Sequence, residues 1–282
     1  MRVGRLTGRS GLEWPYPADD GTGPVGSLTG GLADRLRRRG GHATVTSARD
    51  GRPMDTLSFA VTVERAAAGL SRRGMCPGDV VGVLAPVSPE RHTAVYTVMA
   101  VGGIALPLEL TSDLETLIEV LTRTDVRLLL VSVPFAGIAL ELADRSRVRQ
   151  IIAFGDAPDT TPFGELLLPS PDGSGYDPTR GLFDNGILAY QGTADNVLTT
   201  LHSHTDLLGT FRRLSADLAL TAEDTVAVDP HMPEPVRSAL GAVALWNGAS
   251  VVTTTSETEA DIREDLKAFD ITVHGSPVPA RV

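Results

Sequence analysis

The segment of this chain placed where a phosphate-binding loop would be expected runs from Gly192 to His204, with the sequence GTADNVLTTLHSH. It follows a short apolar segment at 187–190 and precedes a helical pattern, and a loop in that context commonly binds phosphate. Such a loop needs several glycines, whose backbone N–H groups close on the phosphates, and a lysine as counter-charge. Here Gly192 is the one glycine, Asp195 is an acid, and Lys267 is the only lysine of the whole chain. The segment predicts a phosphate loop that has lost its function.

A second candidate site is the tripeptide Asp229-Pro230-His231. A strand is predicted at 225–229, and open α/β sheets bind ligands beyond the carboxyl ends of their strands. Asp229 and His231 are therefore candidate ligand-binding residues if a pocket forms there.

Four histidines, His202, His204, His231 and His274, could suggest a metal site. They lack the paired spacing of metal ligands, and residues two apart do not share a helix face. We expect no metal, and we expect these side chains to cap helices or to pack in the core.

Ser203, with His202 and Asp206 beside it, could suggest nucleophilic catalysis. The G-x-S-x-G turn that presents such a serine is missing, so capping of the next helix by Ser203 or Thr205 is the favoured interpretation. Cys76 is interpreted as an ordinary small residue, because a reactive thiol needs a positive neighbourhood that only Arg72 and Arg73 could supply.

The composition is that of an ordinary globular protein: 282 residues, 42% hydrophobic and 21% charged. A net charge of -10 argues against non-specific nucleic-acid binding. One cysteine excludes an internal disulfide framework and favours a reducing, cytoplasmic location. No signal peptide and no membrane-spanning run is expected.

The elements that must position these residues alternate along the chain. Helices are expected at 28–36, ending at Gly40-Gly41, and near 60–72, with a hairpin of 43–46 and 56–58 around Asp50-Gly51 between them. Ser88-Pro89-Glu90 should open one helix, and Ser112 with Glu115 should form the capping box of the next. The remaining predicted strands are 80–84, 128–131, 151–154, 187–190, 225–229, 249–254 and 271–274, and the remaining helices are 204–217, 236–247 and 257–269.

Strands that alternate with helices predict an α/β fold with doubly wound, largely parallel sheets. We divide the chain into a flexible arm at 1–27, a first α/β subdomain at 28–155, a connection at 156–184 and a second α/β subdomain at 185–282. The connection is rich in proline, glycine and aspartate.

Several segments, read together, resemble the N-terminal part of the adenylate-forming superfamily, which contains acyl-CoA synthetases, luciferases and peptide-synthetase adenylation domains. Residues 57–70 resemble the first helix after its T-Y-x-E-L signature. Residues 74–84, GMCPGDVVGVL, are similar to its G-x-x-x-G-D-x-V segment, and residues 99–108, MAVGGIALPL, to its K-A-G-x-x-x-x-P-L segment. The order and spacing of these matches cover roughly residues 28–280. The resemblance implies layered αβαβα sheets.

The family's phosphate loop, S-G-T-T-G-x-P-K-G, resembles this chain only at Gly192 and Thr193. The departures are Ala194 for a hydroxyl residue, Asp195 for a glycine, Val197 for the proline, Leu198 for the lysine and Thr199 for the last glycine. An aspartate beside a phosphate costs about 1–4 kcal/mol. Loss of the lysine removes the matching attraction, so triphosphate binding in this mode should be abolished.

The resemblance implies that the family's adenine pocket, ribose-binding aspartate and C-terminal swinging domain come later than the last residue, Val282. The chain is therefore expected to be a shortened and catalytically inactive relative. The family places its acyl pocket near the histidine segment after the phosphate loop, so the resemblance makes His204 a candidate for ligand contact.

Three functions stay open. The first is a binding or assembly module without cofactors, a homodimer or a complex with a biosynthetic enzyme or carrier protein, because a shortened layered domain would expose apolar surface. The second is an acyl-CoA or amino-acid activating ligase that uses ATP and Mg²⁺ together with a partner chain. The third is a sensor of small acyl or aromatic acids.

Overall fold

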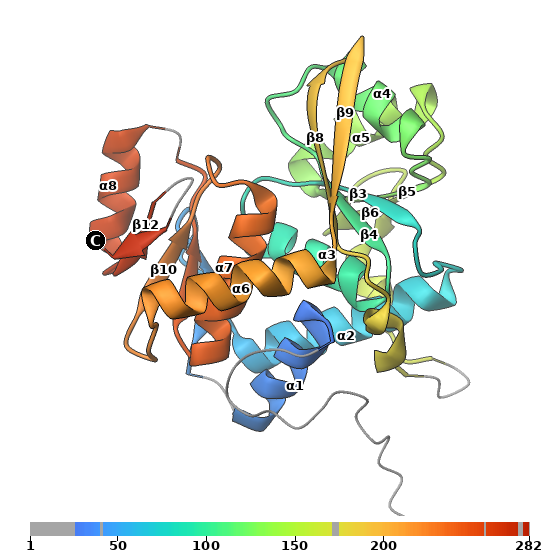
Figure 1. Ribbon diagram of the computed structural model, residues 1–282. Coiled ribbons are helices and arrows are strands. Elements are labelled where there is room, and N and C mark those ends of the chain that lie inside the picture. Colours follow the sequence, from blue (N-terminus) through green and yellow to red (C-terminus); the bar gives the residue numbers. More distant parts are fainter. Residues whose placement is uncertain (1–25, 40–41, 171–174, 257, 276–278, 282) are drawn as a thin grey trace, which may run out of the picture.

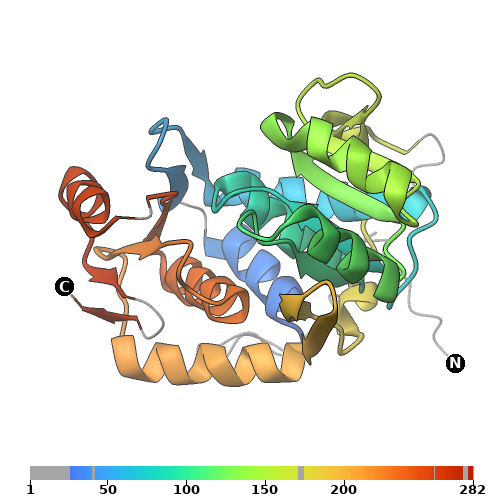
Figure 2. The same cartoon turned by 90° about the horizontal axis from the view of Figure 1, so that it is seen from above.

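Two β-sheets, each flanked by helices, form the body of the protein (Figures 1 and 2). The computed structural model describes residues 26–39, 42–170, 175–256, 258–275 and 279–281. The arm predicted at 1–27 lies almost wholly outside the described residues, and so does the pair Gly40-Gly41.

The larger sheet has seven strands in the order β7-β6-β5-β3-β4-β8-β9, and all neighbours are parallel except the pair β8 and β9. Short apolar runs form its centre, as expected of strands covered on both faces. The strands are β3 (Val80–Leu84), β4 (Ile104–Pro107), β5 (Leu128–Ser132), β6 (Gln150–Phe154), β7 (Thr161–Pro162), β8 (Ile187–Thr193) and β9 (Asn196–His202).

The smaller sheet has six strands in the order β13-β12-β10-β11-β1-β2. Its central strands are parallel, while β2 and β13 are antiparallel edges. The strands are β1 (Thr44–Ser47), β2 (Pro53–Asp55), β10 (Thr225–Val228), β11 (Ser250–Thr253), β12 (Val273–His274) and β13 (Ala280–Arg281).

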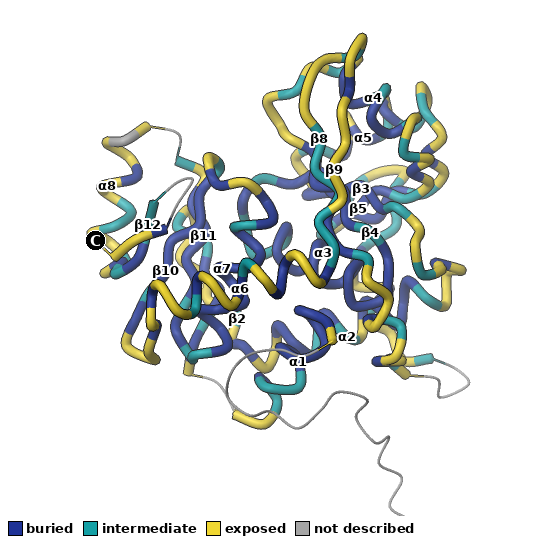
Figure 3. The backbone as a smooth tube through the Cα atoms, in the orientation of Figure 1, coloured by how far each residue is buried: buried dark blue, intermediate teal, exposed yellow. Residues whose placement is uncertain are grey.

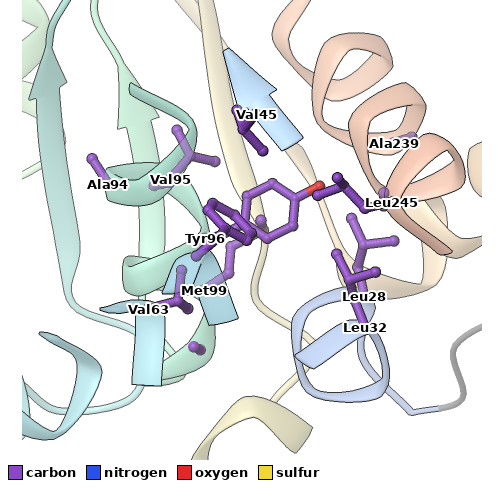
Figure 4. Packing of buried hydrophobic residues seen from close by; sticks show 14 of the residues in the cluster. Leu28, Leu32, Val45, Val63, Ala94, Val95, Tyr96, Met99, Ala239 and Leu245 are labelled. Atoms are coloured by element: carbon purple, nitrogen blue, oxygen red, sulfur yellow. The ribbon is translucent and has the colours of Figure 1, made fainter. Parts of the chain in front are cut away.

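Helices form three layers around the two sheets, so the predicted αβαβα arrangement is confirmed. One core cluster joins the inner faces of both sheets through α1 (Leu28–Arg39), α2 (Thr56–Arg72), α3 (Pro89–Ala100), α6 (His204–Leu218) and α7 (Glu234–Asn247). Figure 4 shows Tyr96 and Met99 of α3 on one side of the core, facing Leu28 of α1 and Leu245 of α7 on the other. The outer faces are covered by α4 (Leu114–Arg123) and α5 (Ala136–Arg145) on the larger sheet and by α8 (Glu259–Ala268) on the smaller one.

Each sheet takes strands from both halves of the chain. Strands β1 and β2 join the smaller sheet, and β8 and β9 join the larger one. Residues 156–184 therefore do not separate the two sheets, and they contain β7 and the 3₁₀ helices Phe163–Leu167 and Pro178–Leu182.

Two local predictions are wrong. Residues 56–58, expected as a strand, open α2, because the Asp55 carboxylate accepts a hydrogen bond from the Ser58 amide and caps that helix. The cap of α4 is Asp113, whose carboxylate accepts from Thr116, and not Ser112. Ser88 does cap α3, with Pro89 in its first turn. Within the described residues, no helix is both long and apolar enough to cross a membrane.

Candidate functional site

The segment predicted as a degenerate phosphate loop is a β-hairpin. Strand β8 continues to Thr193, β9 begins at Asn196, and only Ala194 and Asp195 lie between them (Figure 1). The pairing is unbroken up to Gly192 opposite Val197 and Thr193 opposite Asn196. The expected strand–loop–helix order is wrong, because the β-branched and apolar residues after Asp195 find a partner strand in β8.

The hairpin also accounts for Gly192. This residue has a φ of +107°, a conformation that side chains other than glycine rarely adopt. A Cβ at this position would lie 2.1 Å from the Asn196 carbonyl oxygen. The glycine is therefore required for closure of the hairpin, and its backbone belongs to a ladder that extends to the turn.

Leu198 and Thr199, which the resemblance matched to the family's lysine and last glycine, lie in β9 and are exposed. The cation that the described structure places against this hairpin is Arg123 of α4. Its Nη1 donates to the Val197 carbonyl oxygen at 3.2 Å, and its Nε contacts Glu119. This guanidinium is therefore engaged by a backbone carbonyl group and a neighbouring carboxylate.

The hairpin leads directly into α6 through Ser203. The Ser203 hydroxyl accepts from the Asp206 amide, and the Asp206 carboxylate accepts from the Ser203 amide, which is a complete capping box. The predicted capping role of Ser203 is confirmed, and its partner is the same aspartate that a nucleophilic site would have required.

His204 lies in the core and does not line the cavity next to His231. Its side chain is fully buried, and its Nδ1 accepts from the Leu28 amide at 3.3 Å. Burial lowers the pKa of His204 to about 4, so the imidazole is neutral at physiological pH. These contacts support a structural role in joining α6 to α1.

Asp229 and His231 lie beyond the end of β10, as predicted. The Asp229 carboxylate is also engaged in hydrogen bonds within the protein. Its buried carboxylate accepts from the His231 amide at 2.7 Å and from the Met232 amide at 3.1 Å. Its other oxygen lies 2.9 Å from Nε2 of His274. Burial by itself would raise the pKa of Asp229. The hydrogen bonds from His274 and from the two amides lower it by more than burial raises it, so the net shift is downward. The structure groups Asp229 with His274 and not with His204.

A cavity of about 320 Å³ opens beside His231. It lies where four strands of both sheets end, next to Ala85 after β3, Glu109 after β4, Pro230 after β10 and Thr255 after β11. This is the location at which α/β sheets bind ligands. The side chain of His231 is exposed there.

The floor of this cavity contains Arg91 and Arg237, joined by a carboxylate that sequence analysis missed. Glu234 Oε2 lies 2.7 Å from Arg91 Nε and 2.6 Å from Arg237 Nη1, and all three side chains are at least 95% buried. Burial alone would raise the pKa of Glu234, but Arg237 and Arg91 lower it to about 2. The cluster carries a net charge of +1.

One nitrogen of the Arg91 guanidinium, Nη2, can still donate a hydrogen bond toward the cavity. Its Nη1 donates to the carbonyl oxygens of Ala85 and Leu108, whereas its Nη2 reaches the half-exposed Glu109 only at 3.5 Å. Glu109 is in turn held by Tyr190 of β8, whose hydroxyl accepts from the Glu109 amide at 2.9 Å. With Glu109 included, the four charged side chains carry no net charge, and the cavity can hold a small polar molecule.

Only one feature of the sequence pointed to this cluster. An arginine at position 237 lies in the same helix as the apolar run from Ala239 to Trp246, directly before it begins. Across the described ranges, no group of three or more histidine, cysteine or carboxylate side chains is arranged to hold a metal ion.

Comparison with known proteins gives a family and a fold. The profile of the family described as "AMP-binding enzyme" matches residues 34–178. No curated protein matches the chain. Among solved structures, a long-chain-fatty-acid-CoA ligase from Archaeoglobus fulgidus has a TM-score of 0.71 at 18% identity, over 91% of this chain and 51% of that one.

An anthranilate CoA ligase in complex with anthranoyl-AMP has a TM-score of 0.74 at 17% identity, over 87% of this chain and 48% of its own. A luciferase-like enzyme from the mealworm Zophobas morio has a TM-score of 0.74 at 15% identity, over 91% of this chain and 60% of its own. At such identities the likeness establishes the fold alone. The chain spans between about half and three fifths of the length of these structures.

Proposed function

The chain belongs to the AMP-binding enzyme family and has its adenylate-forming, ligase-like fold, and we propose that it acts as a binding or assembly module that does not itself adenylate carboxylates. The observation that carries this proposal is the closed hairpin of β8 and β9 in place of a phosphate loop. A cytoplasmic location, suggested by the single cysteine, belongs to the same proposal.

A triphosphate does not fit this hairpin for two reasons. The pairing of β8 with β9 up to Thr193 and Asn196 holds both strands extended, so successive backbone N–H groups point in alternate directions and cannot converge on an anion as they do in a phosphate nest. In addition, the exposed Asp195 would face the phosphates with a like charge, which costs about 1–4 kcal/mol. ATP and Mg²⁺ are therefore not part of the proposed function.

We expect the purified chain to show no carboxylate-dependent exchange between ATP and pyrophosphate, and no binding of ATP with Mg²⁺ in calorimetry at millimolar nucleotide. A family member with an intact loop serves as the positive control. The matched variant is Asp195→Lys, which reverses the charge but leaves the hairpin closed, so it should gain no measurable binding. Micromolar ATP affinity in either protein would contradict the proposal.

The ligase alternative requires another chain to supply nucleotide-binding groups, and the ligase fold of the structural neighbours is what favours it. Repeating the exchange assay with candidate partner proteins tests it. Exchange that appears only in such a mixture would replace the present proposal with the ligase function.

The cavity beside His231 supports a second candidate function, the sensing of small acyl or aromatic acids. Its volume of about 320 Å³ suits a small ligand, and Arg91 supplies positive charge. A panel of such acids should raise the melting temperature of the protein, and His231→Ala, at an exposed wall, should reduce the rise. A flat response across the panel would remove this candidate.

A further inference from the structure

Among the described residues, no further strand pairs with the outer edge of β9. It ends the seven-stranded sheet and carries exposed side chains along most of its length (Figure 3). Leu198 is 54% exposed and Leu201 is 44% exposed. No charged residue and no proline lies between Asn196 and His202, although natural edge strands commonly use both to block pairing with another chain.

The direction of the free peptide groups follows from the ladder. The Ala105 amide donates to the Gly186 carbonyl oxygen, so even-numbered residues of β8 face β4 and odd-numbered ones face β9. Ile187 pairs with His202, so the even-numbered residues of β9 face β8. Its odd-numbered residues, Val197, Thr199 and Leu201, must direct their peptide groups outward.

One outward peptide group of β9 already has a hydrogen-bond partner, and this limits the register in which another strand can pair with β9. The Val197 carbonyl oxygen accepts from Arg123, consistent with its outward direction. Thr199 and Leu201 are therefore the residues whose outward peptide groups could pair with another strand while the Arg123 contact persists.

We propose that two copies of the chain pair antiparallel through β9, about a two-fold axis at Thr200. This inference rests on the assembly role proposed above and names the partner as a second copy. Thr199 of each copy then lies opposite Leu201 of the other, Thr200 lies opposite itself, and Leu198 lies opposite His202. Thr199 and Leu201 exchange backbone hydrogen bonds, and the two seven-stranded sheets become one continuous sheet.

The strand is complementary to itself, which favours a second copy over an unrelated peptide. Every pair in this register joins side chains of one face, as antiparallel pairing requires. The strand itself is uncharged, so a two-fold axis brings no like charges together. Dimers with two-fold symmetry are the commonest oligomers of soluble proteins.

The test exploits the two-fold axis. In sedimentation or light scattering at micromolar concentration, the unmodified chain should be a dimer. Thr200→Lys and Thr200→Glu each place like charges opposite one another, and each should weaken the dimer roughly tenfold or more. A mixture of the two variants should form a heterodimer. Ala216→Lys, at an exposed position of α6, is the matched control and should leave the dimer intact.

A monomeric unmodified chain, a dimer that resists both Thr200 variants, or a mixture that fails to associate would each overturn the inference. Circular dichroism of the variants checks that they fold. If no such dimer forms, the proposal that the chain does not adenylate carboxylates still stands. Nucleotide exchange tests that proposal, which does not depend on the oligomeric state.

Discussion

Replacement of Glu234 by glutamine is expected to lower the free energy of unfolding by about 3–5 kcal/mol, the cost of leaving buried charges without their partner. Glu234 lies between the guanidinium groups of Arg91 and Arg237, at 2.7 and 2.6 Å. Glutamine keeps the shape of the side chain but removes its negative charge. Two positive charges would then remain close together in a region with little water. Urea unfolding measures the change directly.

Two controls separate the buried charge from a general effect of the substitution. Glu109→Gln makes the same chemical change on the same Arg91, but Glu109 is 48% exposed and 3.5 Å away, so it should cost less than about 1 kcal/mol. Replacing Arg91, Glu234 and Arg237 together with methionine should cost less than Glu234→Gln alone. If Glu234→Gln is no more damaging than Glu109→Gln, the cluster does not stabilise the fold as described.

The second large effect is a loss of stability in mild acid. Burial lowers the pKa of His92, which lies among Arg91, Arg237 and Glu234, to about 4, and it lowers the pKa of His204, which lies near Asp184, to about 4 as well. Unfolded histidine titrates near 6.5. Between these values the unfolded chain binds more protons than the folded one, so stability is full above about pH 6.5 and falls as the pH drops toward 4.

We expect the two histidines together to remove roughly 4 kcal/mol of unfolding free energy between about pH 8 and about pH 5. Glu234 contributes little in this window, because its folded pKa of about 2 and its ordinary value of 4.5 both lie below pH 5. Denaturant midpoints measured across the range give the slope. His204→Asn retains an acceptor for the Leu28 amide but cannot titrate in this range, so it should halve the fall. An unchanged slope in this variant would exclude His204 as a source.

The local pattern predicted most elements because their signals are local. The run Val80–Leu84 forms a strand with the expected bounds, and Ser88 caps the helix that Pro89 opens. Where two capping residues stood side by side, as at Ser112 and Asp113, composition could not choose between them, since the choice depends on the backbone angle at which the chain enters the helix.

The site was harder to predict because its parts are distant in the sequence. Asp229 and His231 were placed correctly at a strand end, but His204 is separated from them by its own packing against α1. Arg91 and Glu234 are 143 residues apart, and they meet only because α3 and α7 both lie between the two sheets. No periodicity in either helix encodes that contact.

By itself, the sequence determined the alternation of strands and helices, the layered α/β class, and the absence from 192–204 of the lysine and additional glycines that a phosphate loop requires. These follow from residue type and short-range spacing. Only the tertiary structure decided that residues 192–202 close into a hairpin, that His204 is a core residue, and that a buried carboxylate holds two arginines under the cavity. Strand pairing and charge burial depend on which distant segments meet, and that is a property of the packed fold.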